Sequence, residues 1–265
     1  MLYDMHIHSE ISVDSDAAMA DVAAQAFQKG LGGICFTEHV DFGFPDPDPG
    51  WHSIDLVKYS AGIEEARERY PDKWIGVGIE AGMHEGLFDE TKKYLDSLNL
   101  DFVIGSVHVI DNVDTYTPAF FEGRSKAAVF TEYLQAVLHC IQNFSAFNVL
   151  GHITFPSKFA PYADARLYYD DTPDLIDAIL ETLISGGKGL EINTSAYQKI
   201  GTTMPCVDIL KRYKQLGGDI ITLGSDAHRA DRVAQYFSHA CEIAKEAGFD
   251  YACRFEEMRP VFYRI

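Results

Sequence analysis

The pattern of apolar and polar positions along the chain alternates short apolar runs with amphipathic stretches. Seven of the runs have the length of buried strands, and each is followed by positions with helical spacing. This repetition is typical of βα units whose parallel strands close into a barrel. The predicted strands are Leu2–His8, Gly33–His39, Trp74–Gly82, Phe102–Val109, Val149–Ile153, Gly189–Asn193 and Ile220–Ser225.

Helix boundaries are marked clearly at three places. One helix is expected over Ala17–Lys29, and a second over Ile54–Arg69 with Ser53 as its cap. A third begins at Pro173, which suits a first helical position, and stops at Gly186. The sequence therefore predicts an α/β fold of the TIM-barrel type, a distorted (β/α)7 barrel.

A segment rich in proline and glycine follows the second predicted strand. Val40–His52 contains three prolines and two glycines, which prevent regular structure. In a parallel β/α barrel the active site forms where the strands end, so a loop at this position can cover the site. The sequence leaves two interpretations open, a substrate lid or a rigid surface connection.

Composition supports one domain and excludes several kinds of function. A chain of 265 residues that is 47% hydrophobic can bury a large core, and nothing divides it, so residues 1–265 are predicted to form a single domain. The net charge of -18 disfavours a nucleic-acid substrate, because acidic surfaces repel phosphates. The start of the chain has no signal-peptide pattern, and no run approaches eighteen apolar residues. We therefore expect a cytoplasmic protein without membrane contacts.

Cysteine usage suggests neither disulfides nor a thiolate metal site. The five cysteines are odd in number, widely spaced and lack a CxxC pair. They are expected to be reduced thiols in the core.

Histidines and carboxylates gather where the predicted strands end. Six of the ten histidines lie at these exits, far more than random placement would give. The carboxyl ends of parallel strands share one end of a barrel, so these side chains are predicted to meet and bind metal. They are His6, His8, His39, Glu80, His108, His152, Asp226 and His228.

Two pairs with the same spacing strengthen this interpretation. On a strand, the period of two puts His6 and His8 on one side, about 6 to 7 Å apart along the chain, so both can reach one ion. Asp226 and His228 repeat the spacing at the other end of the sequence. Glu80 lies in an apolar strand, where burying a carboxylate is costly unless an ion compensates it. A bridging metal ligand is its expected role.

Together, the motifs resemble those of a known family, the polymerase and histidinol phosphatase (PHP) family. Six motifs occur in order along nearly the full chain: HIH with Asp14, FTEH, GIEAG, GSVH, GHI and GSDAH. The EINTS motif and the proline-rich loop resemble the histidinol-phosphatase branch. The resemblance implies a cytosolic phosphoric monoester hydrolase that converts L-histidinol phosphate and water to L-histidinol and phosphate in histidine biosynthesis.

The resemblance also implies how the metals are held. It implies two to three divalent ions of zinc, manganese or iron, with a metal-bridging hydroxide held by Glu80 as the nucleophile. Asp14, which pattern alone assigns to a loop, enters as a ligand through the resemblance. The implied groups are His6, His8, Glu80 and Asp226 for one metal, Glu80, His108 and His152 for a second, and Asp14, His39 and His228 for a third.

Two positions depart from the branch, where relatives usually carry arginines that bind phosphate. Here they are Lys158, which keeps the charge without the bidentate fork, and Gln198, which has no charge. Both are predicted to contact the substrate phosphate, and the departure leaves the exact substrate open.

Two alternatives to a histidinol phosphatase therefore remain. One is a phosphatase acting on nucleotide monophosphates or another small phosphoester, and the other is a non-catalytic metal-binding module. If the partner is histidinol phosphate, the loop carboxylates can meet its cationic groups and the loop aromatics can stack on its ring, although at least two of the three aspartates have the pattern of solvated turn residues. These loop residues are Asp41, Asp46, Asp48, Phe42, Phe44 and Trp51.

Overall fold

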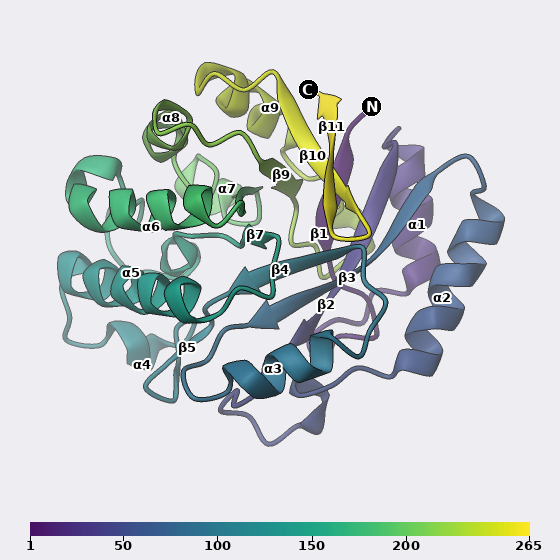
Figure 1. The fold of residues 1–265 in the computed structure, drawn as a ribbon, viewed down its shortest axis with the longest axis horizontal. Coiled ribbons are helices and arrows are strands. Elements are labelled where there is room, and N and C mark those ends of the chain that lie inside the picture. Colours follow the sequence, from purple (N-terminus) through teal and green to yellow (C-terminus); the bar gives the residue numbers. More distant parts are fainter.

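The computed structural model describes residues 1–265 as a sheet of seven parallel strands with helices around it (Figure 1). The strands follow one another in chain order, which confirms the predicted β/α barrel of seven units. Five strands match their predicted bounds within one residue at each end, and the other two end earlier than predicted. The seven strands are β1 (Tyr3–Ile7), β2 (Gly33–Val40), β3 (Trp74–Gly82), β4 (Phe102–Ser106), β7 (Val149–Leu150), β8 (Gly189–Asn193) and β9 (Ile221–Gly224).

The barrel closes between its first and last strands. Ile7 and Ala227 form a parallel bridge just past the end of β9. The Asp226 amide donates to the His6 carbonyl at 2.8 Å, and the His8 amide donates to the Ala227 carbonyl at 3.0 Å. These bonds bring the two histidine motifs from opposite ends of the sequence side by side, as a closed barrel requires.

Helices surround the sheet and bury their apolar faces against it. In α6 the buried positions Ile176, Ile179, Leu180 and Leu183 follow helical spacing and join a core cluster of 59 buried residues. No helix is both long and apolar enough to cross a membrane. The helices are α1 (Met19–Gln28), α2 (Leu56–Arg69), α3 (Phe88–Leu95), α4 (Pro118–Phe121), α5 (Lys126–Asn143), α6 (Pro173–Ser185), α7 (Tyr197–Ile200), α8 (Val207–Gln215) and α9 (Phe237–Glu246), with 3-10 turns at η1 (Pro49–Trp51), η2 (Phe155–Lys158), η3 (Tyr169–Asp171) and η4 (Ala230–Arg232).

Two details of the local prediction were wrong. The cap of α2 is Asp55 and not Ser53, because the helix begins two residues later than predicted and the Asp55 carboxylate accepts from Val57 N and Lys58 N. The fourth strand does not run on to Val109. After β4 ends, β5 (Val109–Ile110) and β6 (Val113–Asp114) form a separate hairpin before α4.

A second hairpin, which the sequence pattern did not reveal, ends the chain. It pairs β10 (Tyr251–Glu256) with β11 (Arg259–Arg264) and appears in yellow near β9 in Figure 1. Its Cys253 and Phe255 pack with Cys35 and Phe102, which lie near the starts of β2 and β4. The hairpin therefore packs at the end of the barrel away from the strand exits. All five cysteines are free thiols, as predicted.

Candidate metal centre

Glu80 lies at the centre of the histidine cluster, near the end of β3, and is fully buried. Its Oε2 atom faces three imidazole nitrogens, at 3.0 Å from His6 Nε2, 3.3 Å from His8 Nε2 and 3.3 Å from His39 Nδ1. The Nε2 atoms of His6 and His8 are themselves only 3.1 Å apart. Three nitrogens and a carboxylate oxygen thus converge on one small volume.

The other oxygen of Glu80 faces a second pair of histidines. Its Oε1 atom is 2.8 Å from Nε2 of His152, which follows β7, and 3.3 Å from Nε2 of His108, which follows β4. The carboxylate therefore separates two groups of nitrogen donors. This is the arrangement in which one carboxylate can bridge two ions.

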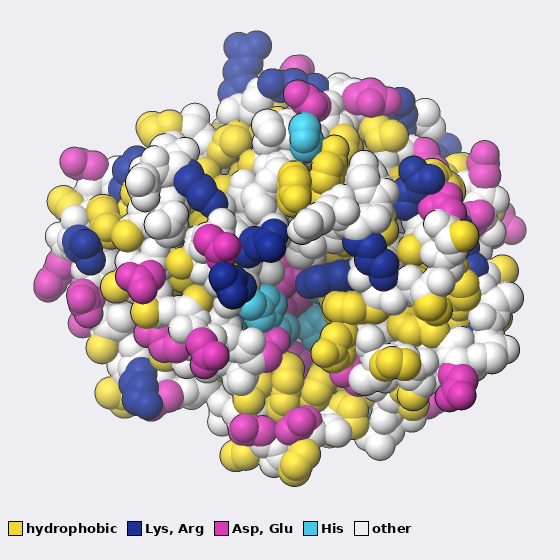
Figure 2. Space-filling model, turned by 180° about the vertical axis from the view of Figure 1, so that it is seen from behind, with side chains coloured by type: hydrophobic (Ala, Val, Ile, Leu, Met, Phe, Trp, Pro, Cys, Tyr) yellow, Lys and Arg dark blue, Asp and Glu magenta, His cyan; other side chains and the backbone are white.

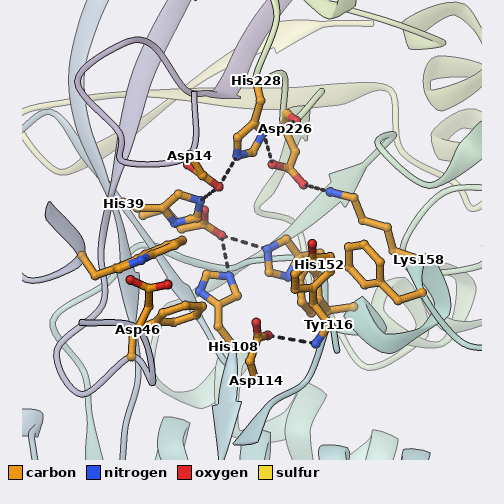
Figure 3. A pocket seen from close by; sticks show the side chains of 15 residues that line it. Asp14, His39, Asp46, His108, Asp114, Tyr116, His152, Lys158, Asp226 and His228 are labelled. Carbon is orange, nitrogen blue, oxygen red and sulfur yellow. Dashed lines mark hydrogen bonds and ion pairs between the residues drawn. The ribbon is translucent and has the colours of Figure 1, made fainter. Parts of the chain in front are cut away.

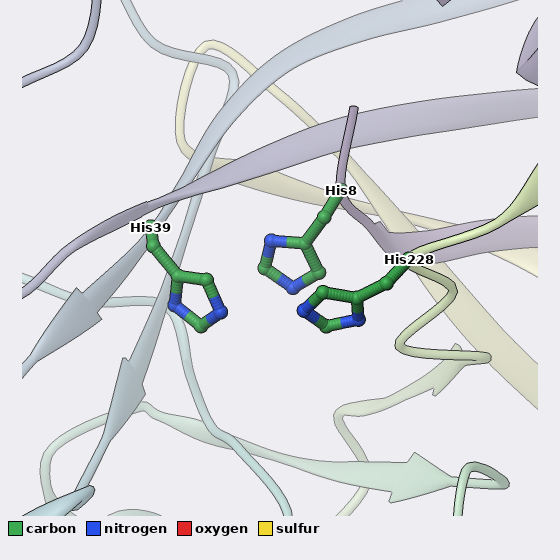
Figure 4. Close-up of side chains that lie close together, drawn as sticks. All are labelled: His8, His39 and His228. Carbon is green, nitrogen blue, oxygen red and sulfur yellow. The ribbon is translucent and has the colours of Figure 1, made fainter. Parts of the chain in front are cut away.

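A third group lies closer to solvent and contains Asp14 and His228. The Oδ2 atom of Asp14 is 3.0 Å from His228 Nε2 and 3.5 Å from His39 Nε2. Figure 4 shows the rings of His8, His39 and His228 side by side, with ring centroids of His8 4.2 Å from each of the other two.

Asp226 joins the first group to the third. Its Oδ1 atom lies 3.5 Å from both His8 Nε2 and His228 Nδ1. Asp226 also has a positive φ of 51°, a backbone conformation that is costly for a residue other than glycine and is often found at functional sites. Seven of the nine predicted metal ligands line one cavity, and the other two, His6 and His8, lie against Glu80 without lining it.

The charges of the cluster are strongly coupled. Burial raises the pKa of Glu80, but the charges of His6 and His108 outweigh burial and hold it well below its usual value. Burial lowers the pKa of His108, yet the charges of Asp41 and Glu80 raise it to about 10. In the metal-free chain, protonated histidines thus balance the negative charge of the buried carboxylates.

Several buried polar atoms in the cluster have no hydrogen-bond partner. They are Glu80 Oε2, His39 Nδ1, His152 Nδ1 and Asp41 Oδ2. Such atoms are rare in protein interiors, and two of them belong to the donor groups described above. Imidazole nitrogens and carboxylate oxygens are also the ligands that zinc, manganese and iron take in proteins. The residues present therefore fit a cluster of divalent ions.

We expect zinc binding at pH 7 to release up to three protons per chain, one each from His6, His39 and His108. Nearby carboxylates raise the pKa of all three despite burial, whereas burial lowers the pKa of His8 to about 4. A protonated imidazole cannot bind metal, so zinc affinity should rise as the pH rises from 7 toward 10. Calorimetric titration in two buffers of different ionisation enthalpy measures the release. Equal heats in both buffers would show that these histidines are neutral before zinc binds.

A cavity of about 450 Å³ opens over the cluster. Figure 2 shows it as a hollow with histidine and acidic side chains at its floor and basic and hydrophobic side chains around it. Apart from the metal-binding groups, its lining is aromatic, acidic or basic: Phe44, Asp46, Trp51, Asp114, Tyr116, Phe155, Lys158 and Phe159.

The structure separates the two predicted phosphate-binding residues. Lys158, on η2, lines the cavity and places its Nζ 2.8 Å from Asp226 Oδ2 (Figure 3). Gln198, on α7, does not line the cavity. Its side chain is exposed, with Oε1 3.5 Å from Arg232 Nη1, because α7 turns Ile200 and not Gln198 toward the core.

The Val40–His52 loop lines the cavity with only some of the expected residues. Phe44, Asp46 and Trp51 line it, and the rings of Phe44 and Trp51 stack at 3.9 Å. Asp41, one of the candidates for contact with the substrate, does not line the cavity. It is buried at the end of β2, and its Oδ1 lies 2.8 Å from His108 Nδ1.

Sequence reasoning also missed two buried carboxylates beside the cluster. Glu191 Oε1 lies 2.6 Å from His6 Nδ1, and Glu38 accepts from Ser9 and Ser12 next to His8. Glu191 lies between apolar neighbours in its strand, the same signal that identified Glu80, whereas Glu38 lies between Thr37 and His39.

The fold and this site together define a metal-binding β/α-barrel protein of the hydrolase type. A family model for the PHP domain matches residues 4–195. The chain belongs to this family.

Relatives of known name agree with the family match. The chain is 35% identical over 258 residues to a histidinol-phosphatase of Lactococcus lactis, covering 97% of this chain and 95% of the relative. It is 30% identical to a protein of Clostridium acetobutylicum named "Probable histidinol-phosphatase", covering 99% and 97%. A crystal structure of the histidinol phosphate phosphatase of L. lactis with zinc, L-histidinol and phosphate superposes with a TM-score of 0.89 at 33% identity, covering 98% of each chain.

Proposed function

We propose that the chain is a metal-dependent phosphomonoester hydrolase that converts L-histidinol phosphate to L-histidinol and phosphate. The observation that carries this proposal is the position of Glu80 between two groups of imidazole nitrogens. Above it lies a cavity with metal-binding side chains at one end and carboxylates and aromatic rings at the other. Relatives that share at least 30% of the sequence over nearly the whole chain bear names with this activity. We place the activity in the cytoplasm, with two to three divalent ions as cofactors.

One end of the cavity suits a phosphate group. Divalent ions held by the nine ligands would neutralise phosphate charge and lower the pKa of water enough to supply a nucleophile near neutral pH. Lys158 lies beside Asp226 at this end, with its Nζ within 6 Å of the ring centroids of Phe155 and Phe159. Its ammonium group can turn from Asp226 to a phosphate oxygen and stabilise the charge that develops there.

The rest of the cavity suits an aromatic cation. In Figure 3, Asp46 and Asp114 lie across the pocket from Asp226 and His228. Beside them, Tyr116 packs edge-on against Phe159 with centroids 4.6 Å apart. L-Histidinol phosphate carries an ammonium group and an imidazole, which carboxylates and aromatic faces bind well. A nucleotide monophosphate offers no cation to these two carboxylates, so the cavity favours the amino alcohol phosphate.

Residues of the chain would perform the positioning in this reaction. Glu80 lies between two groups of nitrogen donors and Asp226 links two others. Lys158 would orient the phosphate, and the stacked Phe44 and Trp51 would shield one wall from water. The phosphate would lie over the donor cluster, and the amino alcohol would lie against Asp114. The P–O bond that joins them would break when water attacks phosphorus.

A phosphate-release assay tests the proposal. The full-length chain, loaded separately with zinc, manganese and iron, is assayed with L-histidinol phosphate and a panel of nucleotide monophosphates. We expect the highest kcat/KM with L-histidinol phosphate. Faster release from a nucleotide would support the alternative phosphatase, and no release from any substrate would support a metal-binding module.

Asp114→Asn should raise KM for L-histidinol phosphate about tenfold with little change in kcat. Asp114 is half-buried at the end of β6, and a charge-assisted bond to the substrate ammonium is stronger than a neutral one by about 1.4 kcal/mol. Steady-state kinetics measure KM and kcat. Asp111→Asn, an exposed position on the same hairpin, is the matched control and should leave both unchanged.

Glycerol phosphate, which lacks an amine, distinguishes charge recognition from a change of pocket shape. Its KM should be the same in Asp114→Asn as in the unaltered protein. An equal rise in KM for both substrates would refute the role of Asp114 in binding the ammonium.

A further inference from the structure

The ring nitrogens of His6 and His108 that face away from Glu80 each meet a buried carboxylate. Glu191 Oε1 is 2.6 Å from His6 Nδ1, and Asp41 Oδ1 is 2.8 Å from His108 Nδ1. Glu191 is fully buried and Asp41 is 3% exposed, and no lysine or arginine pairs with either. An ionised carboxylate only accepts hydrogen bonds, so each facing Nδ1 must carry the proton.

Protonation at Nδ1 decides what the other nitrogen of a neutral ring can do. With Nδ1 as donor, Nε2 keeps its lone pair, which is the form that binds metal. The Nε2 atoms of His6 and His108 both point at Glu80, at 3.0 and 3.3 Å from its oxygens. The two outer carboxylates and Glu80 thus hold each ring from opposite sides.

Glu191 is itself held in place by other donors. Its Oε2 accepts from the backbone amide of His152 at 2.7 Å and from Asn193 Nδ2 at 3.2 Å. Both oxygens therefore act as acceptors, and a side chain with a donor in either position would leave two donors facing each other.

Glycines leave the space that the two carboxylates occupy. A Cβ atom added at Gly224 would overlap Glu191 Oε1, and one added at Gly82 would overlap Asp41 Oδ1. The strands β9 and β3 thus carry their smallest residue at the point where each carboxylate lies against the neighbouring backbone. This packing is independent of the hydrogen bonds and fixes the same geometry.

A third histidine, His8, contacts a buried carboxylate indirectly, through the hydroxyl group of Ser12. Ser12 Oγ donates to Glu38 Oε2 at 2.6 Å, so it can accept from His8 Nδ1, which lies 3.2 Å away. Glu38 is fully buried. Three rings around the centre are therefore oriented by buried carboxylates.

We propose that Glu191 and Asp41 are positioning residues that hold His6 and His108 in the orientation in which Nδ1 donates to a buried carboxylate and Nε2 faces the metal cluster. The inference rests on the metal-binding part of the proposed function and not on its substrate. Neither carboxylate is expected to touch the substrate, because both lie behind the imidazoles.

Glu191→Gln tests the proposal with almost no change of shape. A glutamine must turn its amide toward either His6 Nδ1 or the His152 backbone amide, so one bond is lost in either orientation. We expect the zinc affinity of the full chain to fall by about 10- to 100-fold, the usual effect of removing such a partner. The measurement is a competition titration of the metal-free chain with zinc and a chromophoric chelator. Glu181→Gln, exposed on α6, is the control and should bind zinc like the unaltered chain.

Asp41→Asn provides a second test on another histidine, with the exposed Asp48→Asn in the same loop as its control. The expected loss of zinc affinity is of the same size. Circular dichroism shows whether each metal-free variant folds. The test needs only one of the two variants to fold. Zinc affinities within about twofold of the unaltered chain for both variants would overturn the proposal.

A double-variant cycle distinguishes positioning from general damage. If Glu191 acts through His6, Glu191→Gln should weaken zinc binding by about threefold or less once His6 is replaced by alanine. The full loss in that background would refute the positioning role. Zinc is the only ligand in these experiments, so a chain that behaves as expected but releases no phosphate would refute the proposed substrate alone.

Discussion

Glu80→Ala is expected to lower kcat/KM for L-histidinol phosphate by roughly a thousandfold, about 4 kcal/mol, and His152→Ala by about a hundredfold. The Glu80 carboxylate faces nitrogen donors on both sides, so its loss would remove a ligand from two ions and the group that sets their separation. His152 lies near Oε1 of Glu80 only, and its loss would remove one ligand from one ion. Steady-state kinetics at saturating zinc measure the difference.

A matched control removes a carboxylate without touching the cluster. Glu85 is exposed, follows the same strand and lies outside the cavity lining, so Glu85→Ala should keep full activity. Circular dichroism should show that all three variants fold. Unchanged activity of Glu80→Ala at saturating zinc would mean that the reaction takes place elsewhere.

The centre of the site could be predicted because burial of charge is costly. Glu80 stands out in an apolar strand, and the structure places it among five histidines. The same argument applies to Glu38 in β2 and Glu191 in β8, which are also fully buried. Applied to every strand, it would have identified these two residues as well as Glu80.

Asp41 shows where sequence reasoning stops. It directly follows β2 and begins a loop of prolines and glycines, so its pattern is that of a solvated turn residue. Only the path of the chain brings it to His108, 67 positions later in the sequence. A backbone bond from the Asp41 amide to the Trp51 carbonyl at 2.6 Å helps to hold the loop in this path.

The C-terminal hairpin was missed for a different reason. Its turn consists of Glu257 and Met258, both with positive φ, where asparagine and glycine usually mark a two-residue hairpin loop. Pro260 in β11 further weakens the strand pattern, and it is tolerated because β11 pairs with β10 alone. Packing of Cys253 and Phe255 against the barrel stabilises an element that local sequence does not favour.

The sequence also could not predict in which direction side chains on the short helices point. The family resemblance implies phosphate-binding residues at the positions of both Lys158 and Gln198, yet only Lys158 lines the cavity. A turn of 3-10 helix directs Lys158 toward Asp226, whereas α7 leaves Gln198 in solvent near Arg232. The predicted role of Gln198 in binding phosphate gains no support from this geometry.

Removal of metal by a chelator is expected to lower phosphate release more than a thousandfold, and added zinc should restore it. Nine ligand side chains exceed what one four- to six-coordinate ion can use, so the restored chain should contain two to three equivalents of zinc. Elemental analysis after gel filtration measures the content. A content that stays below one equivalent with zinc in excess would refute the cluster.

Thermal unfolding of the same samples tests the metal centre without any substrate. Zinc at a hundred times its dissociation constant should stabilise the folded chain by about 2.7 kcal/mol per site. For a chain of this size, one such site corresponds to a rise in Tm of roughly 5 to 10 °C. The rise should be larger than in Glu80→Ala, because that variant lacks the carboxylate that faces both groups of nitrogen donors and would hold the ions. An equal rise in both proteins would show that zinc stabilises the chain from a different site.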